Sequence, residues 1–130
     1  MIQLDTNALI WRELEPAKLS LRAKSAIEAA ALAGEEITVS PITLWEIAQL
    51  TIRGRIQLKV PVEIFLKNIE DNYRLTAITS YVVIEAAHLA EPFPKDPMDR
   101  LITATAMVED LTLITADRNI LASKACKMLW

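Results

Sequence analysis

The sequence of 130 residues predicts an α/β fold, a three-layer α/β/α sandwich with a central parallel sheet, as one domain over residues 1–130. Short apolar runs typical of buried strands alternate with longer segments of helical period, and parallel strands need such helical crossovers. The length suits one domain, since domains commonly span roughly 100 to 200 residues. No Gly- or Ser-rich linker, low-complexity tract or internal repeat divides the chain.

The individual elements follow from apolar periodicity and helix punctuation. Strands are expected at residues 2–4, 37–39, 75–78, 111–115 and 126–129. Helices are expected after Asp5, at 21–33, from Pro41 to Gly54, at 61–72, 79–90 and 97–109, and after Asp117. Ser20 and Ser40 suit helix N-caps, because a serine oxygen accepts a hydrogen bond from the first turn. Gly34 and Gly54 suit helix ends, since glycine readily adopts the left-handed conformation that follows a helix.

Composition excludes several classes of protein. Hydrophobic residues make up 52% of the chain and charged residues 24%, which excludes disorder as the main state. Fourteen Lys and Arg against seventeen Asp and Glu give a net charge of −3, so a phosphate-bearing partner must be held by local groups. Two glycines are too few for a Gly-rich phosphate loop. One cysteine, Cys126, forms no intramolecular disulfide, and His and Cys at zinc-binding spacing are absent.

Apolar residues also bear on location and self-association. The first residues lack a basic segment followed by an apolar stretch, and no apolar run reaches the roughly 18 residues of a membrane span. We therefore expect a soluble cytoplasmic protein with no membrane contact. The expected helices at 21–33 and 81–90 are rich in Ala, Ile and Leu, more than one small sheet covers, which predicts a homodimer.

Two acidic residues follow expected strands: Asp5 comes directly after the strand at 2–4, and Asp117 comes two residues after the strand at 111–115. Each is a candidate helix N-cap, whose carboxylate accepts hydrogen bonds from the first turn. Each also lies at the carboxyl end of a parallel strand, where open α/β sheets bind their ligands. Taken one at a time, the two residues leave both interpretations open.

Two further acids lie in expected helices. Glu46 has mostly apolar neighbours, and a lone carboxylate in such a setting is costly unless it is paired or bound to a metal. Glu46 belongs to a narrow polar stripe at helical spacing that either faces solvent or carries a site. The stripe consists of Thr43, Glu46, Gln49 and Arg53.

The segment Asp96-Pro97-Met98-Asp99 contains the other acid. Asp96 suits a helix N-cap, and Asp99 suits an acid in the first turn, which the helix dipole favours.

The predicted fold brings these acids to one edge of the sheet. Clustered carboxylates repel one another unless a cation lies among them, and oxygen ligands without His or Cys favour Mg²⁺ or Mn²⁺. Such an ion orients a water, lowers its pKa and stabilises the leaving oxygen of a phosphodiester. The sequence therefore predicts metal-dependent phosphodiester hydrolysis. Its catalytic and metal-binding residues are expected to be Asp5, Glu46, Asp99 and Asp117, which we call the acidic quartet.

Four segments in order along the chain carry a family resemblance: LDTNALIW at 4–11, VSPITLWEI at 39–47, DPMDRLITA at 96–104 and LITAD at 113–117. Together they resemble the PIN-domain ribonucleases of the VapC-like toxin group, over nearly the whole chain. The resemblance implies a compact PIN-like domain whose acidic pocket binds Mg²⁺ or Mn²⁺ and cuts RNA. It further implies a toxin inhibited by a small cognate antitoxin, which would bind as an amphipathic segment and bring an Arg or Lys to the acidic pocket.

Matched to the family's motifs, the acidic quartet corresponds to its catalytic acids. Asp96 is an additional acid with a capping or supporting role. The resemblance also implies that Thr115 lines the pocket and that Thr6 supports the first acid. Met98 stands where relatives usually have Phe, and residues 93–95 lack the His that often precedes the motif. These departures concern substrate contacts rather than the metal site.

The remaining chemistry-bearing residues have plainer expected roles. His88 is expected to be half-buried in a helix, Arg100 to form an ion pair, and Cys126 to lie in the core. The tryptophans Trp11, Trp45 and Trp130 are expected to pack in the core or an interface. The cations that either face solvent or contact an RNA backbone are Arg12, Arg22, Lys24, Arg53, Arg55 and Lys59.

Alternatives to a nuclease remain open from the residues alone. An aspartyl-phosphate phosphatase also places an Asp after the first strand but needs a second Asp two residues later, where this chain has Asn7. A receiver domain needs a phosphoacceptor Asp after a central strand, whereas Ser40 follows the second strand here. A non-catalytic interaction module fits if the acids are only helix caps.

Overall fold

The computed structural model describes all 130 residues and contains a five-stranded sheet in which every neighbouring pair of strands is parallel. The strand order is β3-β2-β1-β4-β5, with β1 (Ile2–Leu4), β2 (Ile37–Val39), β3 (Arg74–Leu75), β4 (Thr112–Ile114) and β5 (Met128–Leu129). The helices are α1 (Thr6–Leu14), α2 (Leu21–Leu32), α3 (Pro41–Ile52), α4 (Val62–Asn72), α5 (Ser80–His88), α6 (Pro97–Val108) and α7 (Arg118–Ser123). The predicted fold class is confirmed.

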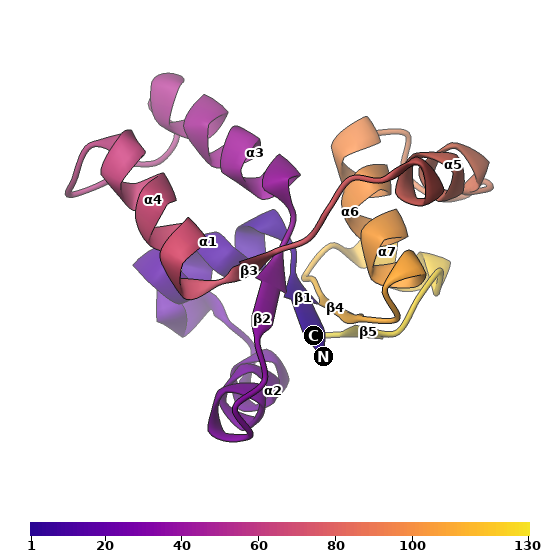
Figure 1. The fold of residues 1–130 in the computed structure, drawn as a ribbon, viewed down its shortest axis with the longest axis horizontal. Helices are drawn as coiled ribbons and strands as arrows, with labels where there is room; N and C mark the ends of the chain where they lie inside the picture. The colour runs from indigo at the N-terminus through magenta and orange to yellow at the C-terminus, as the bar shows by residue number, and fades with distance from the viewer.

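The sheet separates two cores. Ile2 and Leu4 of β1 belong to a cluster of 15 buried residues shared with helices α1 to α4. Leu113 of β4 belongs to a second cluster with residues of α6 and α7, and α5 packs on the outside of α6. Figure 1 shows α1, α3 and α4 on one side of the strands and α5, α6 and α7 on the other. Successive residues of a strand point to opposite faces, so β4 places Ile114 in the first cluster and Leu113 in the second.

The predicted boundaries of α2 and α3 are confirmed by the residues that cap these helices. Ser20 Oγ accepts from the Ala23 N–H at 3.0 Å, and Ser40 Oγ accepts from the Ile42 N–H at 3.1 Å. Gly34 and Gly54 follow α2 and α3 with φ angles of +73° and +70°, the left-handed conformation that favours glycine. A short 3₁₀ turn, Pro16–Lys18, was not part of the predicted pattern.

The prediction of a strand at 75–78 is wrong, because β3 comprises only Arg74–Leu75. Thr76 still donates its N–H to Val39 O at 3.0 Å, and its hydroxyl then turns into the sheet's interior. From there the chain crosses the end of the sheet to reach α5 on the other side (Figure 1). Apolar composition alone does not distinguish such a crossing segment from a strand.

The predictions for single residues have mixed outcomes. His88 is exposed at the end of α5 rather than half-buried. Trp11 and Trp130 pack together with ring centroids 5.6 Å apart, whereas Trp45 is 53% exposed and therefore outside the core. Cys126 is half-buried against the second core, and burial raises the pKa of its thiol to about 11.

No helix is both long and apolar enough to span a membrane.

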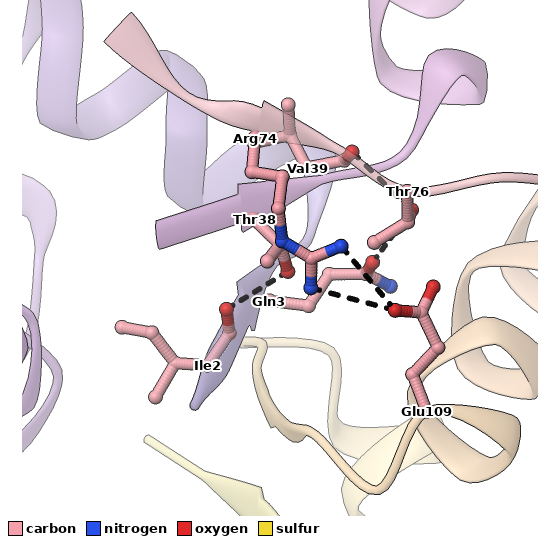
Figure 2. A network of polar contacts seen from close by, with 7 residues as sticks. All are labelled: Ile2, Gln3, Thr38, Val39, Arg74, Thr76 and Glu109. Atoms are coloured by element: carbon pink, nitrogen blue, oxygen red, sulfur yellow. Dashed lines mark hydrogen bonds and ion pairs between the residues drawn. The ribbon is translucent and has the colours of Figure 1, made fainter. Parts of the chain in front are cut away.

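Polar contacts connect α6 to the sheet, and Figure 2 shows two of the contacts near this connection, Gln3 with Thr76 and Arg74 with Glu109. Gln3, fully buried on β1, donates from Nε2 to Ile102 O of α6 at 2.8 Å and accepts at Oε1 from the Thr76 hydroxyl at 3.0 Å. At the far end of α6, Arg74 of β3 contacts Glu109 at 3.4 Å. The helix is thus connected at two points to strands of the sheet.

Gln3→Glu is expected to destabilise the protein far more than Gln3→Met. The glutamate would place a carboxylate oxygen against Ile102 O, leaving a buried charge with Thr76 as its one donor and no cation, at a cost of about 3 kcal/mol or more. Methionine removes only the hydrogen bonds, at a cost of about 1 kcal/mol. Urea unfolding at neutral pH measures both free energies, with Gln57→Glu on the exposed surface as control. Equal losses for the two Gln3 variants would contradict this role.

Candidate active site

The candidate site lies where the order of strands reverses direction. From β1 the chain first builds outward to β2 and β3, then returns to place β4 on the other side of β1. Leu4 and Ile114 are paired at the carboxyl ends of β1 and β4, and the Asp5 N–H donates to Ile114 O at 3.1 Å. Open α/β sheets bind ligands at such a switch point, because the connecting segments diverge there and leave a crevice.

The acidic quartet surrounds one cavity of about 290 Å³ at this point. Asp5 and Asp117 reach it from the ends of β1 and β4, Glu46 from α3 and Asp99 from the first turn of α6. All four side chains are half-buried. The other lining residues are Thr6, Asn7, Trp45, Gln49, Leu50, Arg53 and Ile102. The structure therefore brings together all four acids that the sequence singled out, while their chemical roles remain predictions.

Asp5 and Asp117 are helix caps and cavity residues at the same time. Asp5 Oδ1 accepts from the Asn7 N–H at 2.8 Å, and Asp117 Oδ1 accepts from the Asn119 and Ile120 N–H groups at 2.8 and 3.0 Å. The buried Thr115 hydroxyl donates to Asp5 Oδ2 and accepts from the Asp117 N–H at 3.1 Å. Thr115 thus links the two acids, and capping does not exclude a functional role.

Glu46 is held by a hydroxyl from the neighbouring helix α1. Thr6 donates to Glu46 Oε1 at 2.6 Å, and the Thr6 and Thr43 hydroxyls lie 3.0 Å apart. The expectation that Thr6 supports Asp5 is therefore wrong, since its hydroxyl serves Glu46. Thr43 is fully buried, so this part of the predicted polar stripe turns inward instead of facing solvent. The hydrogen bonds leave Glu46 Oε2 free to face the cavity.

Asp99 has the least compensated charge of the quartet. No hydrogen bond to its carboxylate is present, and it forms no ion pair. Burial raises the pKa of Asp99 to about 7, with further contributions from the negative charges of Asp96, Asp5, Asp117 and Glu46. Burial likewise raises the pKa values of Asp5 and Glu46. The surroundings thus disfavour the ionised form of these carboxylates, and a bound cation would stabilise that form.

Arg100 does not supply that cation. Its guanidinium donates to the backbone oxygens of Pro94, Ala86 and Leu89 at 3.0, 3.1 and 2.9 Å, so the predicted ion pair is wrong. Arg100 instead stabilises the turn between α5 and α6 through these three hydrogen bonds. Asp96 is exposed and caps α6 by accepting from the Met98 N–H at 2.8 Å, as predicted.

The donor set fits a hard divalent cation. It consists of carboxylate oxygens, and Glu46, Asp99 and Asp117 each retain an oxygen that accepts no hydrogen bond. No three Asp, Glu, His or Cys side chains meet closely enough to form a ready-made metal site. The quartet lines the walls of the cavity, and its free oxygens would turn inward to ligate an ion.

Comparison with known proteins identifies the family. The PIN domain profile matches residues 2–125. The chain belongs to the PIN-domain family. It is 39% identical over 119 residues to Ribonuclease VapC22 of Mycobacterium tuberculosis (strain ATCC 25618 / H37Rv), covering 92% of this chain and 88% of that protein.

Solved structures share the PIN fold at lower sequence identity. VapBC2 from Rickettsia felis, bound to a DNA fragment from its promoter, matches with a TM-score of 0.72 and 17% identity over 99% of this chain and 98% of that chain. A toxin-antitoxin complex from Klebsiella pneumoniae matches with a TM-score of 0.69 and 20% identity, over 100% and 97% of the two chains. The resemblance inferred from the four segments is confirmed.

Trp45 was expected to pack in the core or in an interface; its exposure excludes the core, and its place at the cavity was not predicted. An apolar neighbourhood on a helix suggests packing, yet Trp45 lines the cavity wall together with Gln49 and Arg53. A signal was available in the sequence: Trp45 lies four residues before Gln49 and so shares its side of the helix. Periodicity gives relative orientation, but only packing against neighbouring helices shows which side is left open.

Asp99→Asn is expected to stabilise the metal-free protein at neutral pH and to lose this effect in acid. With its pKa raised from 3.8 to about 7, folded Asp99 binds its proton more tightly than the unfolded chain does. Its contribution to stability is therefore full below about pH 4 and is lost as the pH rises through about 7. Asparagine stays neutral throughout this range.

Melting temperatures measured in chelator between about pH 4 and pH 8 test this expectation. The gain of Asp99→Asn over the unmodified chain should grow with pH, while Glu28→Gln on the exposed side of α2 shows no such trend. A gain that is independent of pH would contradict the raised pKa of Asp99.

Proposed function

We propose that this PIN-domain protein is a Mg²⁺- or Mn²⁺-dependent endoribonuclease, the toxin of a toxin-antitoxin pair. The observation that carries the proposal is the acidic quartet around one cavity at the switch point of the sheet, without a Lys or Arg side chain paired to it. The similarity to Ribonuclease VapC22 over 92% of the chain supports RNA as the substrate.

Asp5, Glu46, Asp99 and Asp117 would hold the metal. When bound, a divalent cation supplies an activated water and stabilises the charge on the leaving oxygen of a phosphodiester. Thr115 orients Asp5, and Thr6 fixes one oxygen of Glu46. The free Glu46 Oε2 is available to accept a proton from an attacking water, a role favoured by its raised pKa.

Asp5→Asn and Asp99→Asn are each expected to reduce metal-dependent RNA cleavage by at least about 100-fold, because a lost charged ligand weakens the metal site more than a lost supporting contact. Cleavage of a labelled structured RNA with Mn²⁺ measures this, and chelator should abolish it. Circular dichroism should show an unchanged fold, and Glu63→Gln, exposed on α4, should cleave normally. Cleavage by both Asp variants at unchanged Mn²⁺ dependence would refute the mechanism.

We further propose that a small cognate antitoxin protein inhibits the enzyme by bringing an Arg or Lys to the acidic cavity. A guanidinium or ammonium group would pair with the carboxylates and occupy the place of the cation. The toxin-antitoxin complex from Klebsiella pneumoniae, whose toxin-like fold this chain shares, supports such a partner.

Co-expression with the product of an adjoining small gene is expected to yield a complex without nuclease activity. Asp99→Asn should weaken that complex, since it removes a partner of the inserted cation, whereas Glu63→Gln should not. Unchanged affinity of the Asp99 variant would contradict insertion into the cavity.

The homodimer is proposed to form through α5. Tyr81 and Ile84 are 76% and 57% exposed there, beside Val108 of α6, which is 40% exposed. Large apolar side chains gathered on one face are typical of protein interfaces. Burial of this surface in a second copy of the chain would remove them from water.

Ile84→Glu is expected to convert the dimer to a monomer, because the interface would bury an unpaired carboxylate. Analytical ultracentrifugation at micromolar concentration measures the mass. Ile64→Glu, equally exposed on α4, serves as the control and should remain dimeric. A monomer of 14.5 kDa for the unmodified chain would refute self-association.

A further inference from the structure

One wall of the acidic cavity is not acidic. It is formed by Trp45, Gln49 and Arg53, spaced four residues apart along α3 and its C-cap, which we call the α3 ledge. Residues at this spacing share one side of a helix, and the ledge extends about 12 Å along the axis. It places an indole, an amide and a guanidinium beside four carboxylates, a combination that the metal chemistry of the quartet does not use.

Trp45 is exposed although the two other tryptophans pack together. Its side chain is 53% accessible, while Trp11 and Trp130 are in mutual contact against the main core. An exposed indole on a cavity wall offers a flat surface with no partner in the folded chain. Any nucleobase can stack on such a surface, because every base has a π-face.

Arg53 is the only Lys or Arg that lines the cavity, and it has no partner. It is exposed, forms no ion pair, and its guanidinium makes no hydrogen bond, although four carboxylates line the same cavity. With a net charge of −3, the protein has no general attraction for a polyanion. A free guanidinium at the rim supplies a local contact for a phosphate.

We propose that the α3 ledge binds an unpaired RNA segment beside the cavity, with a base stacked on Trp45 and a backbone phosphate contacting Arg53. The proposal rests on the ribonuclease function proposed above and specifies the form of its substrate. Bases inside a duplex are stacked on each other, so only an unpaired nucleotide can present its face to the indole. Trp45 and Arg53 then act as substrate-positioning residues.

Binding is measured without cleavage, in an Asp5→Asn/Asp99→Asn background that also removes two negative charges from the cavity. The probes are fluorescein-labelled octa-adenylate and an abasic ribose-phosphate octamer with the same number of phosphates, followed by fluorescence anisotropy. Because no catalysis is needed, this result is independent of whether the nuclease mechanism holds. Ile52→Ala is the matched control for Trp45→Ala, since Ile52 is 76% exposed on the same helix but does not line the cavity.

The background protein should bind octa-adenylate about tenfold or more tightly than the abasic octamer, as expected for one stacked base. Trp45→Ala should abolish this preference, Trp45→Phe should retain most of it, and Ile52→Ala should leave it unchanged. Arg53→Ala should weaken both octamers by the same factor and reduce the slope of log affinity against log salt by about 0.7, whereas Arg55→Ala should not.

The proposal is overturned if the background protein shows no preference for bases, or if Trp45→Ala keeps the full preference. It is also overturned if Trp45→Ala weakens only the complex with the antitoxin, which would assign the ledge to a protein partner. The abasic octamer changes the RNA and leaves the protein intact, so the base preference remains testable even if a Trp45 variant fails to fold.

Discussion

Four carboxylates that face one half-buried cavity repel one another, and the surrounding structure has to hold them there. The Asp5 N–H donates to Ile114 O at the end of β4, and the Thr115 hydroxyl links Asp5 to Asp117. Thr6 holds Glu46 from a neighbouring helix. Asp99 has no such partner, and burial together with the neighbouring negative charges raises its pKa to about 7. The folded chain therefore carries an electrostatic cost that a bound cation would offset.

The same acids also serve the local structure. Asp5 and Asp117 cap α1 and α7 with one oxygen each, and Asp96 caps α6 outside the cavity. A helix that begins at the end of a parallel strand needs an N-cap at the place where the sheet binds ligands. Capping and ligand binding are thus compatible demands on one residue, and a single acid in this position cannot distinguish them.

The position of Asp99 depends on contacts made by other residues of α6. Gln3 of β1, two residues before Asp5, donates to Ile102 O in the helix that carries Asp99. Arg100 fastens the turn before that helix through three backbone oxygens. These polar groups are buried or half-buried and paired, so movement of α6 away from β1 would break hydrogen bonds that water cannot easily replace. Asp99 is therefore placed by a helix that is attached to the sheet.

The sequence by itself determined the α/β class, the boundaries of the capped helices and the identity of the four acids, because periodicity, caps and strand ends are local properties of the chain. Only the tertiary structure decided that Thr6 serves Glu46, that Arg100 binds carbonyls, and that the segment after Leu75 leaves the sheet. It also decided that Trp45 faces the cavity. These outcomes depend on which groups from distant segments meet, since a side chain's partner is set by the packing of whole helices and not by its neighbours in sequence.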